Sequence, residues 1–312
     1  MTQPTVTAEL ARYGPRARDV PPPDRAEALA YCRRLARSHY ENFSVVSWLL
    51  PRDLLPHFYA IYAYCRWADD LADETAGAAE SLPLLDCWQQ QLDRCYAGRP
   101  QHPVFVALLP TIETFGIPRD PFNDLLVAFR QDQRVQRYAT PDDVLQYCRH
   151  SANPVGRLIL YVGRCHDESR AALSDSICTG LQLANFCQDV ARDWDAGRVY
   201  LPQSTLNAAG YTEAMFRDRQ CNDAFRAAMR TEVDRAEQFL RDGAALIGQM
   251  PKALRRQVAL FVGGGLEILR SVRRQDYDVW RRRPTVSTPA KVKLMARAWW
   301  RAERIGTEEP QP

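Results

Sequence analysis

The sequence lacks an apolar segment long enough to cross a bilayer. Its longest uninterrupted apolar run, residues 258–266, has nine residues, three of which are glycine, whereas a membrane-spanning helix needs about 20. The N-terminus also lacks the short apolar stretch of a secretory signal. These two absences predict a cytoplasmic protein.

Paired metal ligands are missing as well. The nine cysteines form no CxxC pair, and none of the five histidines stands three positions after a glutamate. The first absence argues against structural zinc and, without an export signal, predicts reduced thiols. The second argues against a di-iron helical bundle, which needs Glu-x-x-His pairs.

An excess of charge of one sign is also absent. Lys and Arg number 41 and Asp and Glu number 38, so the net charge is +3. Such a balance gives no reason to expect a nucleic-acid partner. The composition, 46% hydrophobic and 25% charged, is that of an ordinary globular protein, and it leaves the oligomeric state unknown.

Strict strand-like alternation is not found, and the period that is present is helical. Helix-start signals recur as Asp-Pro at 120–121 and as Thr-Pro at 140–141 and 288–289. We therefore expect an all-α protein. The expected helices lie near residues 25–40, 52–74, 81–96, 102–115, 121–136, 141–163, 169–195, 213–219, 222–248, 252–280 and 288–304.

The domain organisation is expected to be simple. Residues 1–24 end in three consecutive prolines and predict a flexible leader. Residues 25–304 are expected to form a single domain, and residues 305–312 a frayed tail. A weaker boundary near residues 197–202 is the alternative.

The motif FYAIYAYCRWADDLADE places polar residues on one face of a predicted helix. At about 100° per residue, an arc of about 60° holds four of them, namely Tyr62, Arg66, Asp69 and Asp73. Two carboxylates one turn apart are stable only where they face solvent or share a cation. Taken alone, the pattern is more typical of a solvated helix end than of a binding site.

A second segment, LQLANFCQDVARDWD, repeats the pattern. An arc of about 80° holds four polar residues, namely Gln182, Asn185, Asp189 and Asp193. Asp and Asn are poor helix formers, so such a stripe is locally unfavourable and typical of a functional site. Carboxylate and amide oxygens suit Mg²⁺, which favours partners that bring phosphate oxygens. With Arg66 as a phosphate donor, the two stripes predict binding of Mg²⁺ and a diphosphate between facing helices.

These motifs resemble those of the squalene/phytoene synthases, which join prenyl diphosphates head to head. The resemblance runs from about residue 30 to 295. It rests on DDLAD at 69–73, YCRHSANPVG at 147–156, NFCQDVARD at 185–193 and GRVYLP at 197–202. It implies the all-α isoprenoid synthase fold, in which helices surround a central apolar cavity, and a prenyl diphosphate substrate.

The resemblance also implies roles for particular residues. The catalytic, metal-binding carboxylates would be Asp69, Asp73, Asp189 and Asp193, with Asn185 beside them. Arg66 would hold the diphosphate. Apart from the resemblance, the run RRRP at 281–284 follows Tyr277, and its arginines, Arg281 among them, are candidates to reach the diphosphate oxygens. Near the N-terminus the substrate would contact His39, Asn42 and Phe43. The cavity near the reacting carbons would be lined by Tyr62, Tyr147, Gln182 and Tyr277. Tyr62 and Tyr147 are the catalytic candidates, because aromatic ring faces stabilise a carbocation.

Within the family the resemblance is closest to the bacterial hydroxysqualene synthases. It rests on SHYENFS at 38–44, SWLLP at 47–51 and NFCQD at 185–189, where Gln188 replaces an arginine that is more usual in phytoene synthases. It implies Mg²⁺-dependent conversion of presqualene diphosphate and water to hydroxysqualene and diphosphate in squalene and hopanoid biosynthesis, with no NADPH. The alternative is head-to-head condensation to presqualene diphosphate, squalene or phytoene.

Several assignments have structural alternatives. Tyr62 and Tyr147 are also typical of core tyrosines, and His39 of a residue at a helix C-terminus. The basic stretch 291–304, with Trp299 and Trp300, predicts a helix packed on the core or one lying on the inner face of the membrane. A helical scaffold or lipid carrier without catalysis is the competing function, and the intact aspartates argue against it.

Overall fold

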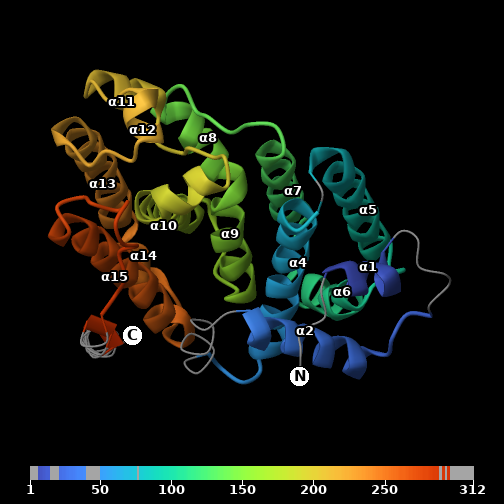
Figure 1. Cartoon of the computed structure of the whole chain (residues 1–312). Coiled ribbons are helices and arrows are strands. Elements are labelled where there is room, and N and C mark those ends of the chain that lie inside the picture. Colours follow the sequence, from blue (N-terminus) through green and yellow to red (C-terminus); the bar gives the residue numbers. More distant parts are fainter. Residues whose placement is uncertain are drawn as a thin grey trace, which may run out of the picture. The chain divides into compact units, whose positions relative to one another are not determined.

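The computed structural model describes residues 6–14, 21–39, 50–75, 77–287, 290–291 and 294–295. In these ranges the regular structure is helical (Figure 1), with one isolated β-bridge between Arg137 and Val199. The predicted all-α class is therefore confirmed. None of the helices in the described ranges is both long enough and apolar enough to span a bilayer.

The chain divides into two compact units. The first comprises Met1–Arg134 and Leu158–Arg164, and the second Val135–Arg157 and Cys165–Pro312. The expectation of a single domain over residues 25–304 stays a prediction.

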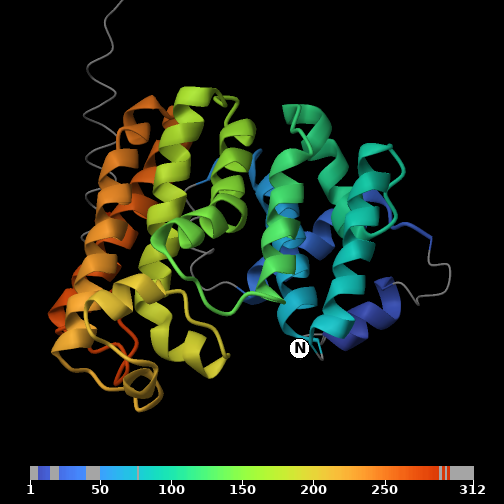
Figure 2. The same ribbon diagram turned by 90° about the horizontal axis from the view of Figure 1, so that it is seen from above.

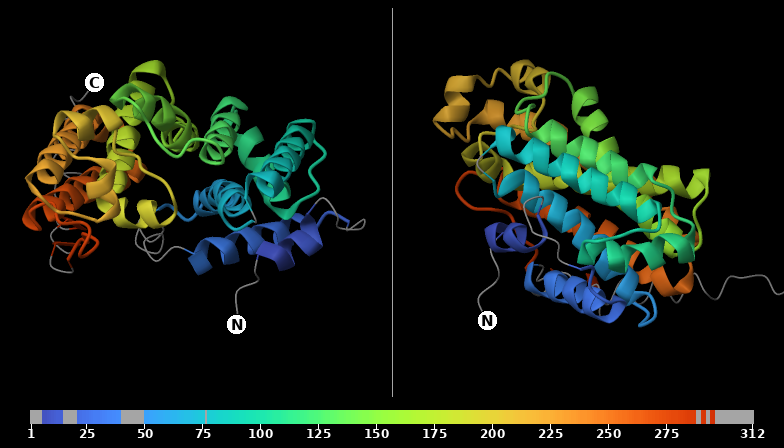
Figure 3. Two further views of the ribbon diagram at one scale, coloured as in Figure 1. Left: turned by 45° about the horizontal axis from the view of Figure 1, so that its top comes forward. Right: turned by 90° about the vertical axis from the view of Figure 1, so that its right-hand side faces the viewer.

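The first unit is built around one central helix. Its helices are α1 (Val6–Tyr13), α2 (Arg25–His39), α4 (Leu55–Asp73), α5 (Ala78–Tyr96), α6 (Pro103–Phe115), α7 (Asp120–Asp132) and the end of α9 (Asn153–Val162). Helix α4 packs against α2, α5, α6 and α7 (Figure 3). It buries Tyr64 completely, and the Tyr64 hydroxyl donates to the Phe122 carbonyl at 2.9 Å. The opposite side of α4 is left for polar residues.

The expected loose leader is wrong for Val6–Tyr13, which form α1. A hydrogen bond from the Tyr31 hydroxyl to Glu9 Oε2, at 2.8 Å, ties α1 to α2. Trp67 Nε1 donates to the same hydroxyl at 2.8 Å. The signal for a leader was the proline run at 21–23, which follows this helix and does not disrupt it.

The second unit is also built around one central helix. Its helices are α8 (Pro141–Ser151), α10 (Glu168–Asp195), α11 (Gln203–Ala208), α12 (Glu213–Arg217), α13 (Asp223–Gly243), α14 (Leu246–Gln249) and α15 (Lys252–Arg274). Helix α10 packs against α8, α13, α14 and α15. Helix α13 lies alongside α10 over most of the length of α13 (Figure 2).

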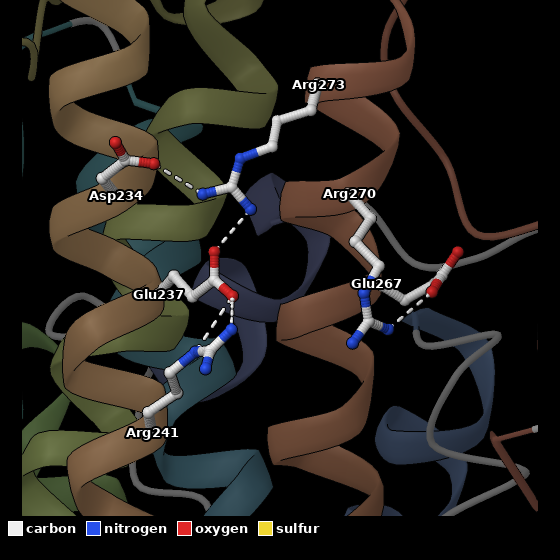
Figure 4. Close-up of polar contacts among 6 residues, drawn as sticks. All are labelled: Asp234, Glu237, Arg241, Glu267, Arg270 and Arg273. Atoms are coloured by element: carbon white, nitrogen blue, oxygen red, sulfur yellow. Dashed lines mark hydrogen bonds and ion pairs between the residues drawn. The ribbon is translucent and has the colours of Figure 1, made fainter.

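Ion pairs join α13 to α15. Arg273 on α15 contacts Asp234 at 2.6 Å and Glu237 at 2.5 Å on α13 (Figure 4). Arg241 contacts the same glutamate at 2.5 Å. Partial burial alone would raise the pKa of Glu237, but hydrogen bonds from Arg241 and Arg273 lower it. Glu237 is therefore a charged link that holds the two helices together.

The observed helices differ from the expected ones where backbone chemistry intervenes. The helix expected over 141–163 is divided into α8 and α9 at Ala152, just before Pro154, which has no N–H to donate. The helix expected over 252–280 ends at Arg274, because Asp276 and Tyr277 take φ of 50° and 61°. Helix α11 was not expected. The helix expected over 288–304, with its predicted membrane contact, lies mostly outside the described residues.

The close approach of α10 and α13 depends on Gly180. A Cβ at Gly180 would lie 2.8 Å from Leu240 Cγ and 2.9 Å from Leu240 N, whereas one at Gly264 on α15 would meet nothing within 4 Å. We expect Gly180→Ala to lower the free energy of unfolding by about 1–3 kcal/mol through overpacking. The control Gly264→Ala should raise it by up to about 1 kcal/mol through helix propensity. Urea unfolding of both variants measures this, and equal effects would contradict it.

Candidate functional site

The polar face of α4 gathers carboxylates around one arginine. The helix buries the face that carries Trp67, Ala68 and Leu71, which leaves Arg66 and its acidic neighbours on the other side. Arg66 Nη1 donates to Asp69 Oδ2 at 3.2 Å, and Nη2 donates to Glu74 Oε1 at 3.1 Å and forms an ion pair with Asp70. One guanidinium thus serves three carboxylates. The face keeps an excess of negative charge, which attracts a cation.

Asp70 supports Arg66 from the buried side. Its side chain is 10% exposed. Burial raises the pKa of Asp70 to about 7, although the ion pair with Arg66 opposes this shift. From its position about 100° around the helix from Asp69, Asp70 is predicted at most to support its neighbours and not to bind the ligand itself. Its contact shows that it positions the guanidinium.

The polar stripe of α10 is centred on Asp189, whose side chain is 12% exposed. Arg283 binds it through two hydrogen bonds, from Nε to Oδ1 at 2.5 Å and from Nη2 to Oδ2 at 2.8 Å. Asn185 Nδ2 donates to Asp189 Oδ2 at 2.8 Å. The hydrogen bond with Asp189 raises the pKa of Arg283. A bidentate pair of this kind fixes both side chains in place.

Gln188 anchors the segment that carries Arg283. Its Nε2 donates to the Pro284 carbonyl at 2.6 Å, and its Oε1 accepts from Arg283 Nη2 at 3.1 Å. Ser271 Oγ on α15 donates to the Thr285 carbonyl at 3.1 Å. Both ends of the Gln188 amide are therefore used to hold residues 283–284 against α10.

Tyr147 belongs to a buried cluster of four aromatic rings. Its ring centroid lies 6.1 Å from that of Phe186 and 5.6 Å from those of Tyr138 and Tyr200. Phe186 and Tyr200 stack at 4.0 Å with an interplanar angle of 7°. Ring packing thus places Tyr147 of α8 against Phe186 of α10, within the core of the unit.

The remaining predicted residues are placed as follows. On α4, Tyr62 is half-buried, and Asp73, the last residue of the helix, is exposed. On α10, Gln182 and Asp193 are half-buried, and Asn185 is exposed. Tyr277 is buried directly after α15, where its ring lies under the Arg230 guanidinium at 5.7 Å. Arg281 is exposed, and Arg283 makes the contact with Asp189 instead. His39 ends α2, and Asn42 and Phe43 lie outside the described residues.

Helix α4 belongs to the first unit and α10 to the second, and the meeting of the two acidic stripes stays a prediction. Within the described ranges, no three His, Cys, Asp or Glu side chains gather into a metal-binding group. Mg²⁺ commonly uses one or two protein carboxylates and takes further oxygens from water and substrate phosphate. Asp69 with Asp73, or Asp189 with Asp193, supplies oxygen ligands of that kind. Mg²⁺ binding stays a prediction.

Arg283 is the contact that sequence reasoning did not single out. The run RRRP at 281–284 indicated phosphate-binding arginines, but the spacing gave no reason to prefer one of the three. The available signal was Pro284, whose fixed φ makes the backbone at that point extended and predictable.

Comparisons with known proteins identify the family of the chain. The sequence matches the model of the squalene/phytoene synthase family over residues 36–290. A 15-cis-phytoene synthase from Synechocystis is 30% identical, with 96% of this chain and 92% of the relative covered.

Two solved structures are also similar to this chain. The squalene synthase HpnC from Alicyclobacillus acidocaldarius has 47% identity and a TM-score of 0.78, with 80% of this chain and 95% of that chain covered. A dehydrosqualene synthase with bound ligand has 25% identity and a TM-score of 0.81, covering 89% and 98%. The predicted resemblance and the predicted isoprenoid synthase fold are thereby confirmed.

Proposed function

We propose that this chain, which belongs to the squalene/phytoene synthase family, converts presqualene diphosphate and water to hydroxysqualene and diphosphate. The observation that carries the proposal is the difference in identity between two groups of relatives. Identity is 47% to a squalene synthase and about 30% to the phytoene synthases. This difference favours a C30 squalene-forming reaction over formation of phytoene.

The described residues include groups that can stabilise a leaving diphosphate. Arg66, held by Asp69, Asp70 and Glu74, is a donor that can bind phosphate oxygens. When bound, Mg²⁺ would supply Lewis-acid stabilisation of the leaving diphosphate. The carboxylates of Asp69, Asp73, Asp189 and Asp193 would hold it, with Asn185 as a further oxygen ligand.

The proposed reaction balances without a reductant. The carbon–oxygen bond to diphosphate breaks, and its electron pair leaves with the diphosphate. The cyclopropylcarbinyl cation rearranges, the oxygen of water bonds to the resulting allylic cation, and one proton is released. Ring faces such as that of Tyr147 stabilise positive charge on carbon. Because no hydride is needed, no NADPH is expected.

Isotope-labelled water tests this proposal directly. We expect purified enzyme with Mg²⁺, presqualene diphosphate and ¹⁸O-water, and without NADPH, to form a C30 alcohol that carries one ¹⁸O by mass spectrometry. Farnesyl diphosphate should remain unconsumed under the same conditions. Consumption of farnesyl diphosphate while presqualene diphosphate persists would show that the proposal is wrong.

The second candidate is head-to-head condensation of two prenyl diphosphates. It is favoured by the identity to a 15-cis-phytoene synthase across 96% of this chain. Release of inorganic diphosphate from farnesyl or geranylgeranyl diphosphate, with a C30 or C40 product, distinguishes it from the first candidate.

A further inference from the structure

The carboxylate of Asp189 has two competing partners. It pairs with Arg283 through hydrogen bonds of 2.5 and 2.8 Å, and it is also one of the four aspartates expected to hold Mg²⁺. This ion binds carboxylate oxygens at about 2.0–2.1 Å. On the oxygens that Arg283 uses, the ion would lie about 4 Å from the guanidinium, where two positive charges repel each other. Arg283 and a divalent cation therefore compete for Asp189.

The hydrogen bonds of Asp189 use most of its accepting capacity. An ionised carboxylate accepts about four hydrogen bonds, two on each oxygen. Oδ2 accepts from Arg283 Nη2 and from Asn185 Nδ2, both at 2.8 Å, and Oδ1 accepts from Arg283 Nε. Arg192 Nη1 lies 3.8 Å from Oδ1, which is too far for a hydrogen bond. Oδ2 is thus fully used, and Asn185 turns its amide nitrogen, rather than its oxygen, toward Asp189.

The burial of the two side chains differs. Asp189 is 12% exposed, whereas Arg283 is 34% exposed. A carboxylate as buried as Asp189 is costly without a cation beside it. The guanidinium of Arg283 reaches solvent more easily, so it can leave without opening the core of the unit. Asp189 is therefore the fixed partner of this pair and Arg283 the movable one.

The backbone that carries Arg283 is held independently of the guanidinium. Gln188 Nε2 donates to the Pro284 carbonyl at 2.6 Å, and Ser271 Oγ donates to the Thr285 carbonyl at 3.1 Å. Neither contact involves the side chain of Arg283. Departure of the guanidinium from Asp189 therefore needs only rotation of that side chain and loss of its 3.1 Å hydrogen bond to Gln188 Oε1. The released group stays tethered beside α10.

We propose that Arg283 is an exchangeable counter-ion of Asp189, which closes the polar stripe of α10 to a divalent cation until its guanidinium swings away. The exchange also requires the Asn185 amide to turn its oxygen toward the cation. The inference rests on the proposed function in one respect, that Asp189 is a metal ligand. It deepens that site, because it makes access of the metal to Asp189 depend on Arg283.

Binding of Mn²⁺ to the full-length protein, with no prenyl diphosphate present, tests the exchange. Mn²⁺ takes oxygen ligands as Mg²⁺ does, and electron paramagnetic resonance counts the free ion, so a titration gives the number and affinity of bound ions. We expect Arg283→Gln to bind one Mn²⁺ at least about tenfold tighter than the wild type, as is typical of coupling between neighbouring charges. The glutamine is neutral, and it leaves the backbone contacts of residues 284–285 in place.

Three variants control this result. Arg282→Gln removes the same charge from the preceding, exposed residue, and it should stay within about twofold of wild type because solvent and salt screen that charge. Asp189→Asn, added to Arg283→Gln, should abolish the gain. Arg283→Lys keeps the charge but loses the bidentate geometry, so its affinity should be intermediate. Circular dichroism checks the fold, and Arg283→Lys carries the test where Arg283→Gln does not fold.

Three results would overturn the proposal. The first is that Arg283→Gln binds Mn²⁺ no better than the wild type, or not at all. The second is an equal gain in Arg282→Gln, which would make the effect one of net charge. The third is a gain that survives Asp189→Asn, which would place the ion elsewhere. Failure of the proposed function would instead appear as absent turnover of presqualene diphosphate with the expected Mn²⁺ binding intact, so the two failures are distinguishable.

Discussion

Asp189→Asn should lower kcat for the proposed diphosphate departure by about 100- to 1000-fold, or about 3–4 kcal/mol of transition-state stabilisation. Asparagine keeps the shape of the side chain and one acceptor oxygen, but it removes the charge that pairs with Arg283 at 2.5 and 2.8 Å. It also removes one of the expected metal ligands. The change is measured as release of inorganic diphosphate from presqualene diphosphate with Mg²⁺.

Asp175→Asn is the matched control, because Asp175 lies on the same helix and also accepts two arginine hydrogen bonds. Arg157 Nε and Nη2 donate to it at 3.0 and 2.6 Å. We expect turnover within about threefold of wild type, since this is a structural pair. A loss of less than about tenfold for Asp189→Asn, about 1.4 kcal/mol, would favour the scaffold or lipid-carrier hypothesis.

The second large effect concerns acid stability and His102. Burial lowers the pKa of His102 from its ordinary value of 6.5 to about 3. In the unfolded chain this histidine takes up a proton near pH 6.5, whereas in the folded chain it stays neutral until about pH 3. Between these values the unfolded state binds more protons, so stability falls as the pH falls. The slope approaches about 1.4 kcal/mol per pH unit, or roughly 2–3 kcal/mol between pH 6.5 and 4.5.

His102→Asn should flatten this part of the pH profile. Asn is a good N-cap and can replace the acceptor that His102 offers to the Val104 N–H at the start of α6, but it does not titrate. Urea unfolding of both proteins at several pH values measures the difference. Other titrating groups, including His57, whose pKa burial also lowers, are common to both proteins and cancel. A difference in stability that does not change with pH would contradict the prediction.

Much of the fold follows from periodicity and helix-start chemistry. The predicted helix start at Thr140-Pro141 is confirmed, and Thr140 forms a capping box with Asp143 there. Helices α4, α6 and α10 begin and end within about three residues of their expected bounds. Helix α1 was missed because eight residues give too short a pattern. The split of α13 from α14 occurs near Gly243, whose absent side chain lets it pack closely on Ile177 and Leu173, a tertiary cause that sequence does not reveal.

The site was predictable in part. Spacing placed Arg66 and Asp69 together on α4 and Asn185 and Asp189 together on α10, because both pairs lie within one helix. Helical spacing could not reveal the contact between Arg283 and Asp189, because these residues are 94 positions apart along the chain. The meeting of the two acidic stripes, the metal and the roles of Asn42 and Phe43 remain predictions.

The double use of the Gln188 amide has a consequence for the divergence of related enzymes. An arginine at this position would set a second guanidinium against that of Arg283, and it would lose the oxygen that now accepts from it. Evolution between the glutamine and arginine forms therefore requires coordinated change at 188 and 283–284. A single exchange designed to convert one product type into another would first disturb this anchor.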